Sequence, residues 1–317
     1  MSKTQDPGLG ERFLSESKRI INKDGSFNVR RVGSDTMIKS SYQFLRNTSW
    51  FIFILLVILT YFMVNALFAL SYVLIGVENI RGLVPIDFWE DFLNAFYFSV
   101  QTFTTVGYGA MAPMGRATSM VAAVEALTGL LSFALATGLL YGRFSRPSAK
   151  LLFSEHALIS PHKDHNALMF RVVNRRRNVL MELEAKVLVK LEEEEDGELK
   201  RKFYRLNLEN DAIHFFPMNW TLVHPIGAGS PLLGLTSDDL KKKKAEVLIL
   251  IKGFDDTFSQ IVHARTSYTA DEIYSGASFD RVFSTDKEGN VIVQVKDIHK
   301  YSERSLNEVE HLFEREK

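Results

Sequence analysis

Thr104-Thr105-Val106-Gly107-Tyr108-Gly109 is the most informative stretch of the chain, because two closely spaced glycines interrupt an apolar region between residues 92 and 115. Glycine readily adopts positive φ angles, so alternating glycines let successive backbone carbonyls point toward one side of a strand. Closely spaced carbonyl oxygens can replace the water shell of a potassium ion. We therefore predict a K⁺ filter formed by Thr105, Val106, Gly107, Tyr108 and Gly109, with K⁺ at the first four residues and no other cofactor.

A short helix is expected directly before the filter, over residues 88–104. Asp87 is a suitable N-cap, and Glu90 and Asp91 would lie in the first turn, where carboxylates are favoured. The C-terminal end of this helix would direct a negative partial charge toward a cation. Irregular backbone at membrane depth must be buried in protein or line a water-filled cavity. One chain supplies one loop, so a fourfold pore requires four chains.

Two apolar segments flank the predicted filter. No charged residue occurs between Arg46 and Glu78, and Glu125 is the only charge between residues 117 and 142. About 20 apolar residues span a bilayer as a helix, and a soluble helix is rarely apolar on every face. We predict transmembrane helices over 48–77 and 116–145. The first lies too far from the N-terminus to favour a signal peptide.

Basic residues beside these helices predict their orientation. Lys and Arg residues precede the first helix and follow the second, and the segment between the helices is mildly acidic. Both termini of a multi-pass membrane protein with this pattern are expected in the cytoplasm. The chain has 38 basic and 38 acidic residues, and this balance argues against a nucleic-acid partner. The absence of cysteine excludes disulfides and cysteine-ligated metals.

The character of the chain changes after residue 150, where short apolar runs alternate with turn residues. This spacing predicts an antiparallel β-sandwich over 150–300, with a long hairpin turning at Asp196-Gly197. Residues 1–34 are interpreted as an N-terminal cytoplasmic segment. Residues 301–317 are interpreted as a charged amphipathic helix from Ser302 onward, or a tail.

Several further motifs follow the filter in a fixed order: RFSRP at 143–147, LFS at 152–154, FRVVNRR at 170–176, HPI at 224–226 with SPL at 230–232, and ARTSY at 264–268 with DEI at 271–273. In this order the chain resembles the inward-rectifier family of potassium channels, and its prokaryotic branch most closely. The resemblance implies a membrane pore module with two transmembrane helices, pore helix and filter, followed by an all-β immunoglobulin-like cytoplasmic sandwich. It also implies a homotetramer, an interfacial helix at 35–47, a bacterial inner-membrane location and gating by the cytoplasmic domain and lipids.

The second transmembrane segment is expected to line the cavity below the filter. Gly129, Phe133, Thr137 and Tyr141 recur every four residues and share one slowly drifting face. The spacing is also compatible with ordinary packing residues, but the family's pore-facing positions match Phe133, Thr137 and Tyr141. A ring of Phe133 side chains could close a gate by dewetting. Gly129 and Gly138 are candidate hinges.

The resemblance also bears on rectification. Strong rectifiers of the family carry an acidic residue at the position of Phe133, so weak rectification is expected here. The family's polyamine positions match Glu182 and Asp256, which could attract polyamines or Mg²⁺ or could simply be a solvated strand face. A salt bridge that braces the filter in eukaryotic members matches Gln101 and Met111, so both charges are missing.

Anionic lipid headgroups are the expected regulators. The family's phosphoinositide-binding positions match Arg143, Arg146 and Arg176 in charge, but two further basic positions match the neutral Ser148 and Ala149. Phosphoinositide activation is therefore left open. The alternative is that these arginines only set membrane topology and solvate the linker.

Two other features of the sequence bear on alternative functions. His162-Lys163-Asp164-His165 has the residue types of a metal site, but no further ligand is evident nearby, which favours a polar turn. A two-helix potassium channel gated by a different cytoplasmic ligand-binding domain is the alternative function, although Gly227-Ala228-Gly229 lacks the third glycine of a dinucleotide-binding motif. Common catalytic motifs are absent from the sequence, so no enzyme activity and no catalytic residues are predicted.

Overall fold

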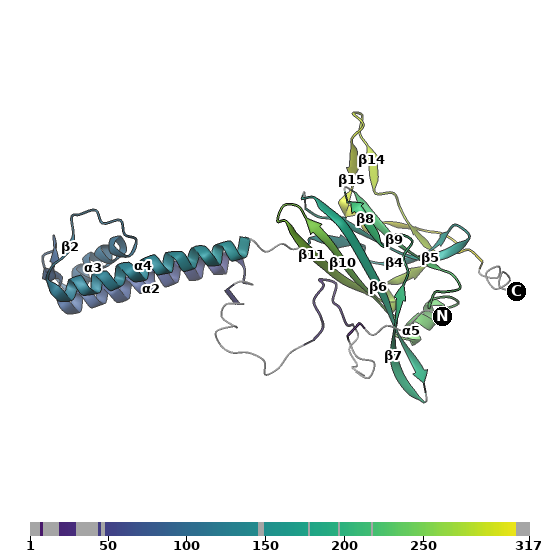
Figure 1. Cartoon of the computed structure of the whole chain (residues 1–317), viewed down its shortest axis with the longest axis horizontal. Helices are drawn as coiled ribbons and strands as arrows, with labels where there is room; N and C mark the ends of the chain where they lie inside the picture. The colour runs from purple at the N-terminus through teal and green to yellow at the C-terminus, as the bar shows by residue number, and fades with distance from the viewer. Residues whose placement is uncertain are drawn as a thin grey trace. The chain divides into compact units, whose positions relative to one another are not determined.

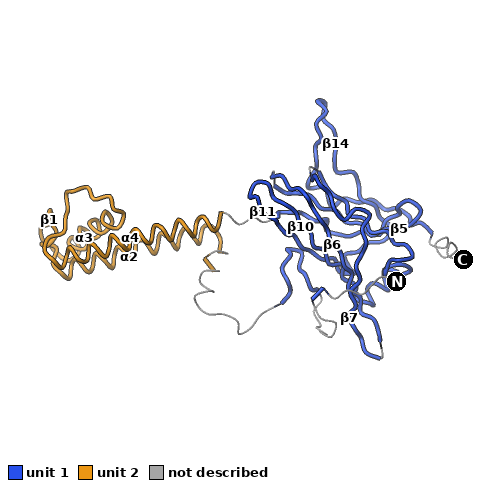
Figure 2. Tube along the Cα trace, in the orientation of Figure 1, with its two compact units in different colours: residues 1–31, 147–317 blue, residues 32–146 orange. Residues whose placement is uncertain are grey.

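The computed structural model describes residues 7–8, 19–29, 44–45, 48–144, 149–176, 178–195, 197–216 and 218–308. The chain divides into two compact units, one comprising residues 32–146 and the other residues 1–31 with 147–317 (Figure 2). The expected interfacial helix at 35–47 lies outside the described residues, apart from the helical Phe44 and Leu45. Arg146 and the segment 309–317 also lie outside them.

The described part of the unit 32–146 contains three long helices: α2 (Trp50–Ile75), α3 (Phe88–Phe103) and α4 (Gly115–Phe144). Helices α2 and α4 are long and apolar enough to cross a membrane, and they correspond to the predicted spans 48–77 and 116–145. The hydroxyl of Ser49 caps α2 by accepting from the Ile52 N–H, and Asp87 caps α3 by accepting from Trp89 and Glu90. Local capping therefore sets where two of these helices begin.

A small core holds the three helices together. Ala69 and Tyr72 of α2 and Phe98 of α3 are buried, and the Tyr72 and Phe98 rings lie 5.0 Å apart. Two short strands, β1 (Ile80–Arg81) and β2 (Ala112–Pro113), pair antiparallel and close the segments that lead into and out of α3. The loop carrying residues 104–109 is thus anchored at both ends.

The second unit is a β-sandwich of two five-stranded sheets (Figure 1). The first sheet has the order β11-β10-β6-β7, with β8 also on β6; the second has the order β12-β4-β5-β3, with β9 also on β5. Its strands are β3 (Leu151–Phe153), β4 (Ala157–His162), β5 (His165–Asn174), β6 (Leu180–Glu195), β7 (Glu198–Leu206), β8 (Ala212–Phe215), β9 (Asn219–Ile226), β10 (Glu246–Asp255), β11 (Gln260–Thr269) and β12 (Ile273–Ser275). All pairs within these sheets are antiparallel except β12 with β4.

Alternation of side chains along the strands produces the sandwich core. On β6, Leu183, Ala185, Val187 and Val189 are buried, and they pack in one cluster with Phe170 and other residues of the facing sheet. A period of two places such residues on one face, which is why the sequence pattern predicted a sandwich. Asp196 of the predicted Asp196-Gly197 turn lies outside the described residues, but β6 and β7 pair on either side of it, with Glu195 opposite Glu198.

Segments near both ends of the chain add to this unit. Ile21 pairs with Phe27 in an isolated bridge, and the Glu246 carboxylate accepts from the backbone N–H groups of Ile20 and Ile21. Helix α5 (Ser237–Lys242) and the pairs β13 (Ala277–Phe279) with β16 (Tyr301–Glu303) and β14 (Phe283–Thr285) with β15 (Val291–Val293) complete it. The expected helix from Ser302 was wrong at its start, because Ser302 pairs with Ser278 in β16. In β16 the backbone N–H and C=O groups form hydrogen bonds with a neighbouring strand, whereas the amphipathic pattern predicted hydrogen bonds within a helix.

Candidate functional site: the pore loop

The loop at residues 104–109 begins with a helix C-cap. The Thr105 N–H donates to the Thr102 carbonyl at 3.1 Å, and the Val106 N–H donates to the Gln101 carbonyl at 2.9 Å. This pair of bonds is a Schellman motif, which requires a left-handed residue just past the helix. Thr105 fills that position with φ +58°, a strained conformation for a β-branched residue. The sequence had indicated positive φ only at the glycines.

Gly107 and Gly109 have φ +52° and +86°. No heavy atom lies within 4 Å of a Cβ added at either position, so in the single chain the backbone conformation, and not crowding, is what requires glycine. Tyr108 is 83 % exposed in the single chain. A large aromatic ring left so exposed beside an apolar loop is available for contact with a neighbouring chain.

Gln101 lies on α3, the expected pore helix, and connects it to the loop at residues 104–109. Its side-chain oxygen accepts from the Tyr108 N–H at 3.3 Å, and its side-chain nitrogen donates to the Met111 sulfur at 3.6 Å. Gln101 is buried. The Gln101 amide therefore links Tyr108 and Met111, which lie on either side of Gly109, through neutral hydrogen bonds and not through a salt bridge.

Behind the pore helix, a buried polar cluster joins all three helices. Tyr72 of α2 donates to Glu125 of α4 at 2.5 Å, and the Ser99 hydroxyl of α3 also hydrogen-bonds to Glu125. Ser99 lies 3.1 Å from both the backbone and the side-chain oxygen of Asn65. All four residues are buried. Glu125 therefore faces protein, and the polar groups of the cluster satisfy one another where lipid would not.

The two glycines of α4 have different surroundings. A Cβ on Gly129 would lie 2.0 Å from the Phe103 carbonyl oxygen, whereas a Cβ on Gly138 would meet nothing within 4 Å. Helix α4 passes through both positions without a break. Gly129 thus has a steric reason to be glycine, because α4 crosses the C-terminal end of the pore helix there.

The predicted cavity residues lie in the C-terminal half of α4. Phe133 is 74 % exposed and Tyr141 is 73 % exposed in the single chain, and the Thr137 hydroxyl donates to the Phe133 carbonyl at 2.9 Å. Leu130 and Leu131 are also about 60 % exposed. Exposure in one chain therefore does not distinguish a pore face from a lipid face.

The predicted lipid-binding arginines have separate environments. The guanidinium of Arg143 donates to the Leu45 and Thr48 carbonyls, and it lies 4.8 Å from the centroid of the Trp50 ring and 4.6 Å from that of the Phe53 ring. Arg176 is exposed just after β5, where its backbone N–H donates to the Asn174 side chain at 3.0 Å. Arg143 is thus held by the start of α2, an attachment that the sequence did not indicate.

Glu182 and Asp256 are brought to the same end of one sheet. Leu180 of β6 pairs antiparallel with Asp255 of β10, so Glu182 lies two residues into β6 and Asp256 lies just beyond the end of β10. Glu182 has φ +51°, and its carboxylate lies 3.2 Å from His214 Nδ1. The adjacent Asp255, which sequence reasoning passed over, is buried and accepts from the Asn178 side chain at 2.8 Å.

Comparisons with known proteins agree with this arrangement. Residues 151–315 match the family described as the inward rectifier potassium channel C-terminal domain, and residues 49–146 match the family described as ion channel. The chain is 37 % identical to the inward rectifier potassium channel Kirbac3.1 of Paramagnetospirillum magnetotacticum, over 93 % of this chain and 99 % of that one. It is 26 % identical to the G protein-activated inward rectifier potassium channel 1 of Bos taurus, over 89 % of this chain and 62 % of that one. It is 30 % identical to the human inward rectifier potassium channel 4, over 62 % of this chain and 46 % of that one.

Proposed function

Because the chain belongs to the inward rectifier potassium channel family, on its prokaryotic side, we propose that four copies assemble around one axis and conduct K⁺ passively. The observation that carries this proposal is the pore loop itself. A short N-capped helix leads into residues 105–109, where Gly107 and Gly109 have positive φ and Gln101 supports the backbone. Four such loops would supply the ring of carbonyl oxygens that K⁺ needs in place of water.

In this proposal Thr105, Val106, Gly107 and Tyr108 hold K⁺, and Gly109 completes the filter. The strained φ of Thr105 is then functional, since a threonine adds a hydroxyl ligand that a glycine at the same position would lack. The large exposure of Tyr108 in one chain is consistent with burial against a neighbouring chain.

We propose that Phe133, Thr137 and Tyr141 line the cavity, with Phe133 as a hydrophobic gate. Gly138 is the better hinge candidate, because Gly129 already has a steric role against Phe103. Position 133 carries a phenylalanine and not an acidic residue, which supports weak rectification. Glu182 and Asp256, repeated in four chains, would then supply the cytoplasmic acidic groups that attract polyamines or Mg²⁺.

We also propose control by anionic lipids at Arg143, Arg146 and Arg176, in the bacterial inner membrane with both termini in the cytoplasm. Arg143 supports this because it joins α4 to the start of α2, so a headgroup that competes for its guanidinium would act on both helices. The alternative of a different cytoplasmic ligand-binding domain is dropped, because residues 151–315 match the inward-rectifier domain.

The proposal is tested by K⁺ flux from liposomes that contain the purified protein, with and without anionic lipid. K⁺, Rb⁺ and Tl⁺ should pass, and Na⁺ should pass much less. Gly107→Ala should abolish flux or selectivity, because its Cβ opposes the positive φ. Normal K⁺ selectivity in this variant, with the tetramer intact, would contradict the assignment of the filter.

A further inference from the structure

A tight hairpin in the cytoplasmic unit places two imidazoles side by side. His162 ends β4 and His165 begins β5, and the two residues are direct partners across the strand pair. Only Lys163 and Asp164 lie between them, and Lys163 has φ +53°, as two-residue hairpin turns require. The ring centroids of the two histidines are 5.5 Å apart. Their spacing is therefore fixed by backbone geometry.

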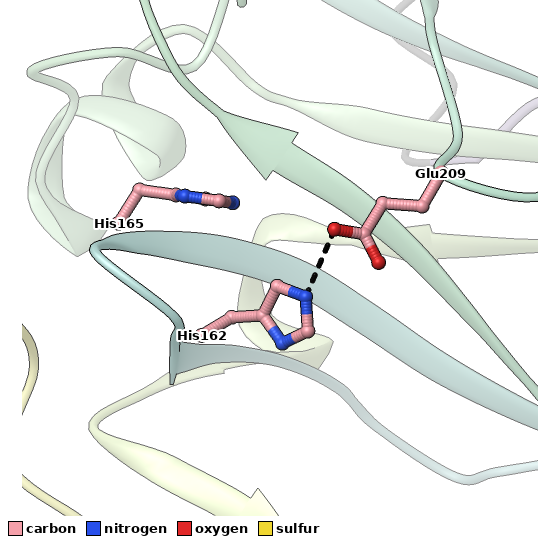
Figure 3. A group of neighbouring side chains, drawn as sticks. All are labelled: His162, His165 and Glu209. Carbon is pink, nitrogen blue, oxygen red and sulfur yellow. Dashed lines mark hydrogen bonds and ion pairs between the residues drawn. The ribbon is translucent and has the colours of Figure 1, made fainter.

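Glu209 comes from a distant part of the chain to the same place. It follows β7, and its backbone N–H donates to the Val223 carbonyl of β9 at 2.9 Å. Its carboxylate oxygen lies 3.0 Å from His162 Nε2. One ligand atom from each of His162, His165 and Glu209 lies within 4.8 Å of the others. Figure 3 shows the His165 ring directed toward the same carboxylate.

One atom of this group has no partner. His165 Nε2 is buried and makes no hydrogen bond to any described residue. Buried polar atoms are normally paired, so an unpaired imidazole nitrogen aimed at a carboxylate calls for a ligand. The competing cation is Lys163, whose ammonium lies 2.7 Å from the same Glu209 oxygen. Its side chain is 64 % exposed, so it can move into solvent.

We propose that His162, His165 and Glu209 bind a divalent transition metal such as Zn²⁺. Two imidazoles and one carboxylate are a ligand set that Zn²⁺ accepts, with a fourth position left for water. Zn–N bonds of about 2.0–2.1 Å require the donor atoms to approach within about 3.4 Å, which small side-chain rotations would achieve. Imidazole ligands favour Zn²⁺, Cu²⁺ or Ni²⁺ over Mg²⁺ and Ca²⁺. The sequence had favoured a polar turn because Glu209 is far from the two histidines along the chain.

The test uses the full-length protein, purified without a histidine tag and stripped with a chelator. Calorimetric titration with Zn²⁺ should give one site per chain, and an excess of Mg²⁺ should not compete. Co²⁺ should give the intense visible absorption of a tetrahedral site. Zn²⁺ should also raise the unfolding temperature, because a ligand that binds only the folded state stabilises it.

Variants distinguish this site from adventitious binding. His165→Gln and Glu209→Gln should weaken Zn²⁺ binding by more than about tenfold, since even partners outside the ligand shell are worth 10–100-fold. Lys163→Gln should tighten binding, because it removes the competing ammonium. His214→Gln is the matched control: it removes an exposed histidine that also contacts a glutamate but has no third ligand within the described part of the chain. The proposal is overturned if Zn²⁺ does not saturate one site per chain, or if His165→Gln binds as the parent does while its metal-free unfolding temperature is unchanged.

Discussion

The side-chain oxygen of Gln101 accepts a hydrogen bond from the backbone N–H of Tyr108, 3.3 Å away, in the middle of the pore loop. Eukaryotic inward rectifiers are expected to carry a salt bridge at this position and at Met111. Here the neutral side-chain amide of Gln101 connects the two positions, because its nitrogen also donates a hydrogen bond to the Met111 sulfur. The loop is thus braced by hydrogen bonds that do not depend on a buried ion pair.

Gln101→Leu should reduce K⁺ over Na⁺ selectivity, because the Tyr108 N–H loses its acceptor. A neutral hydrogen bond contributes about 0.5–1.5 kcal/mol, so the permeability ratio should change by up to about tenfold. Reversal potentials or competitive Rb⁺ and Na⁺ flux would measure it. Met111→Leu is the control, since it removes only the weaker sulfur contact; an equal loss in both variants would contradict the role given to the Tyr108 bond.

Gly129→Ala should destabilise the channel, whereas Gly138→Ala should not. The added methyl at residue 129 would overlap the Phe103 carbonyl oxygen, and that atom belongs to backbone that cannot rotate away. Overpacking of this kind costs about 1–3 kcal/mol. Thermal unfolding of the purified channel checks the difference, and equal unfolding temperatures for the two variants would disprove the close approach of α4 to α3.

Tyr72→Phe should lower the stability of the membrane unit, because it removes the 2.5 Å hydrogen bond to Glu125 while keeping the ring. A buried group that loses its partner costs about 1–3 kcal/mol. Thermal unfolding of the purified protein in detergent provides the measurement. The same Tyr→Phe change at Tyr97, which is 57 % exposed in the single chain, is the control and should have little effect.

The cytoplasmic unit should lose stability as the pH falls below about 6.5, in part through His224. His224 is buried, its Nδ1 donates to the Asn207 carbonyl at 2.6 Å, and its Nε2 accepts from Ser230 at 2.8 Å. Burial lowers its pKa in the folded state. The unfolded chain then binds more protons between the two pKa values, so acidification through this window favours unfolding.

His224→Gln should flatten this dependence. The unfolding temperature of parent and variant, measured between pH 7.5 and 5.5, should differ in slope. The seven other histidines are present in both proteins, so only the difference is informative. Parallel curves would show that His224 does not contribute.

Phe133→Asp should increase block by internal spermine and Mg²⁺ and should raise open probability. If Phe133 faces the pore, four copies would place carboxylates around the cavity and hydrate the gate. Patch recordings test both effects. Phe133→Leu is the control, because it keeps the position apolar and should leave block weak; no change in either property with Asp would place Phe133 away from the pore.

The local features were readable from the sequence because each depends on neighbouring residues. Asp87 caps α3 as expected, since a carboxylate before a helix meets free N–H groups wherever the helix lies. The two transmembrane helices and the alternating strands followed from the periods of their apolar residues. The expected helix does not begin at Ser302, because a charged amphipathic pattern does not reveal that a partner strand lies beside it.

The amino-acid sequence was sufficient to identify the class of the protein: a potassium channel with two membrane helices, followed by a β-sandwich. The length of an apolar run, the spacing of glycines and the alternation of apolar residues in a strand can all be read along the sequence. They therefore need no three-dimensional information. Tertiary structure alone decided which side chains meet. Glu125 with Tyr72 and Ser99, Gly129 against Phe103, and Glu209 beside two histidines each join separate parts of the chain. Such contacts depend on how helices cross and how strands align in three dimensions, and no local pattern of residues encodes them.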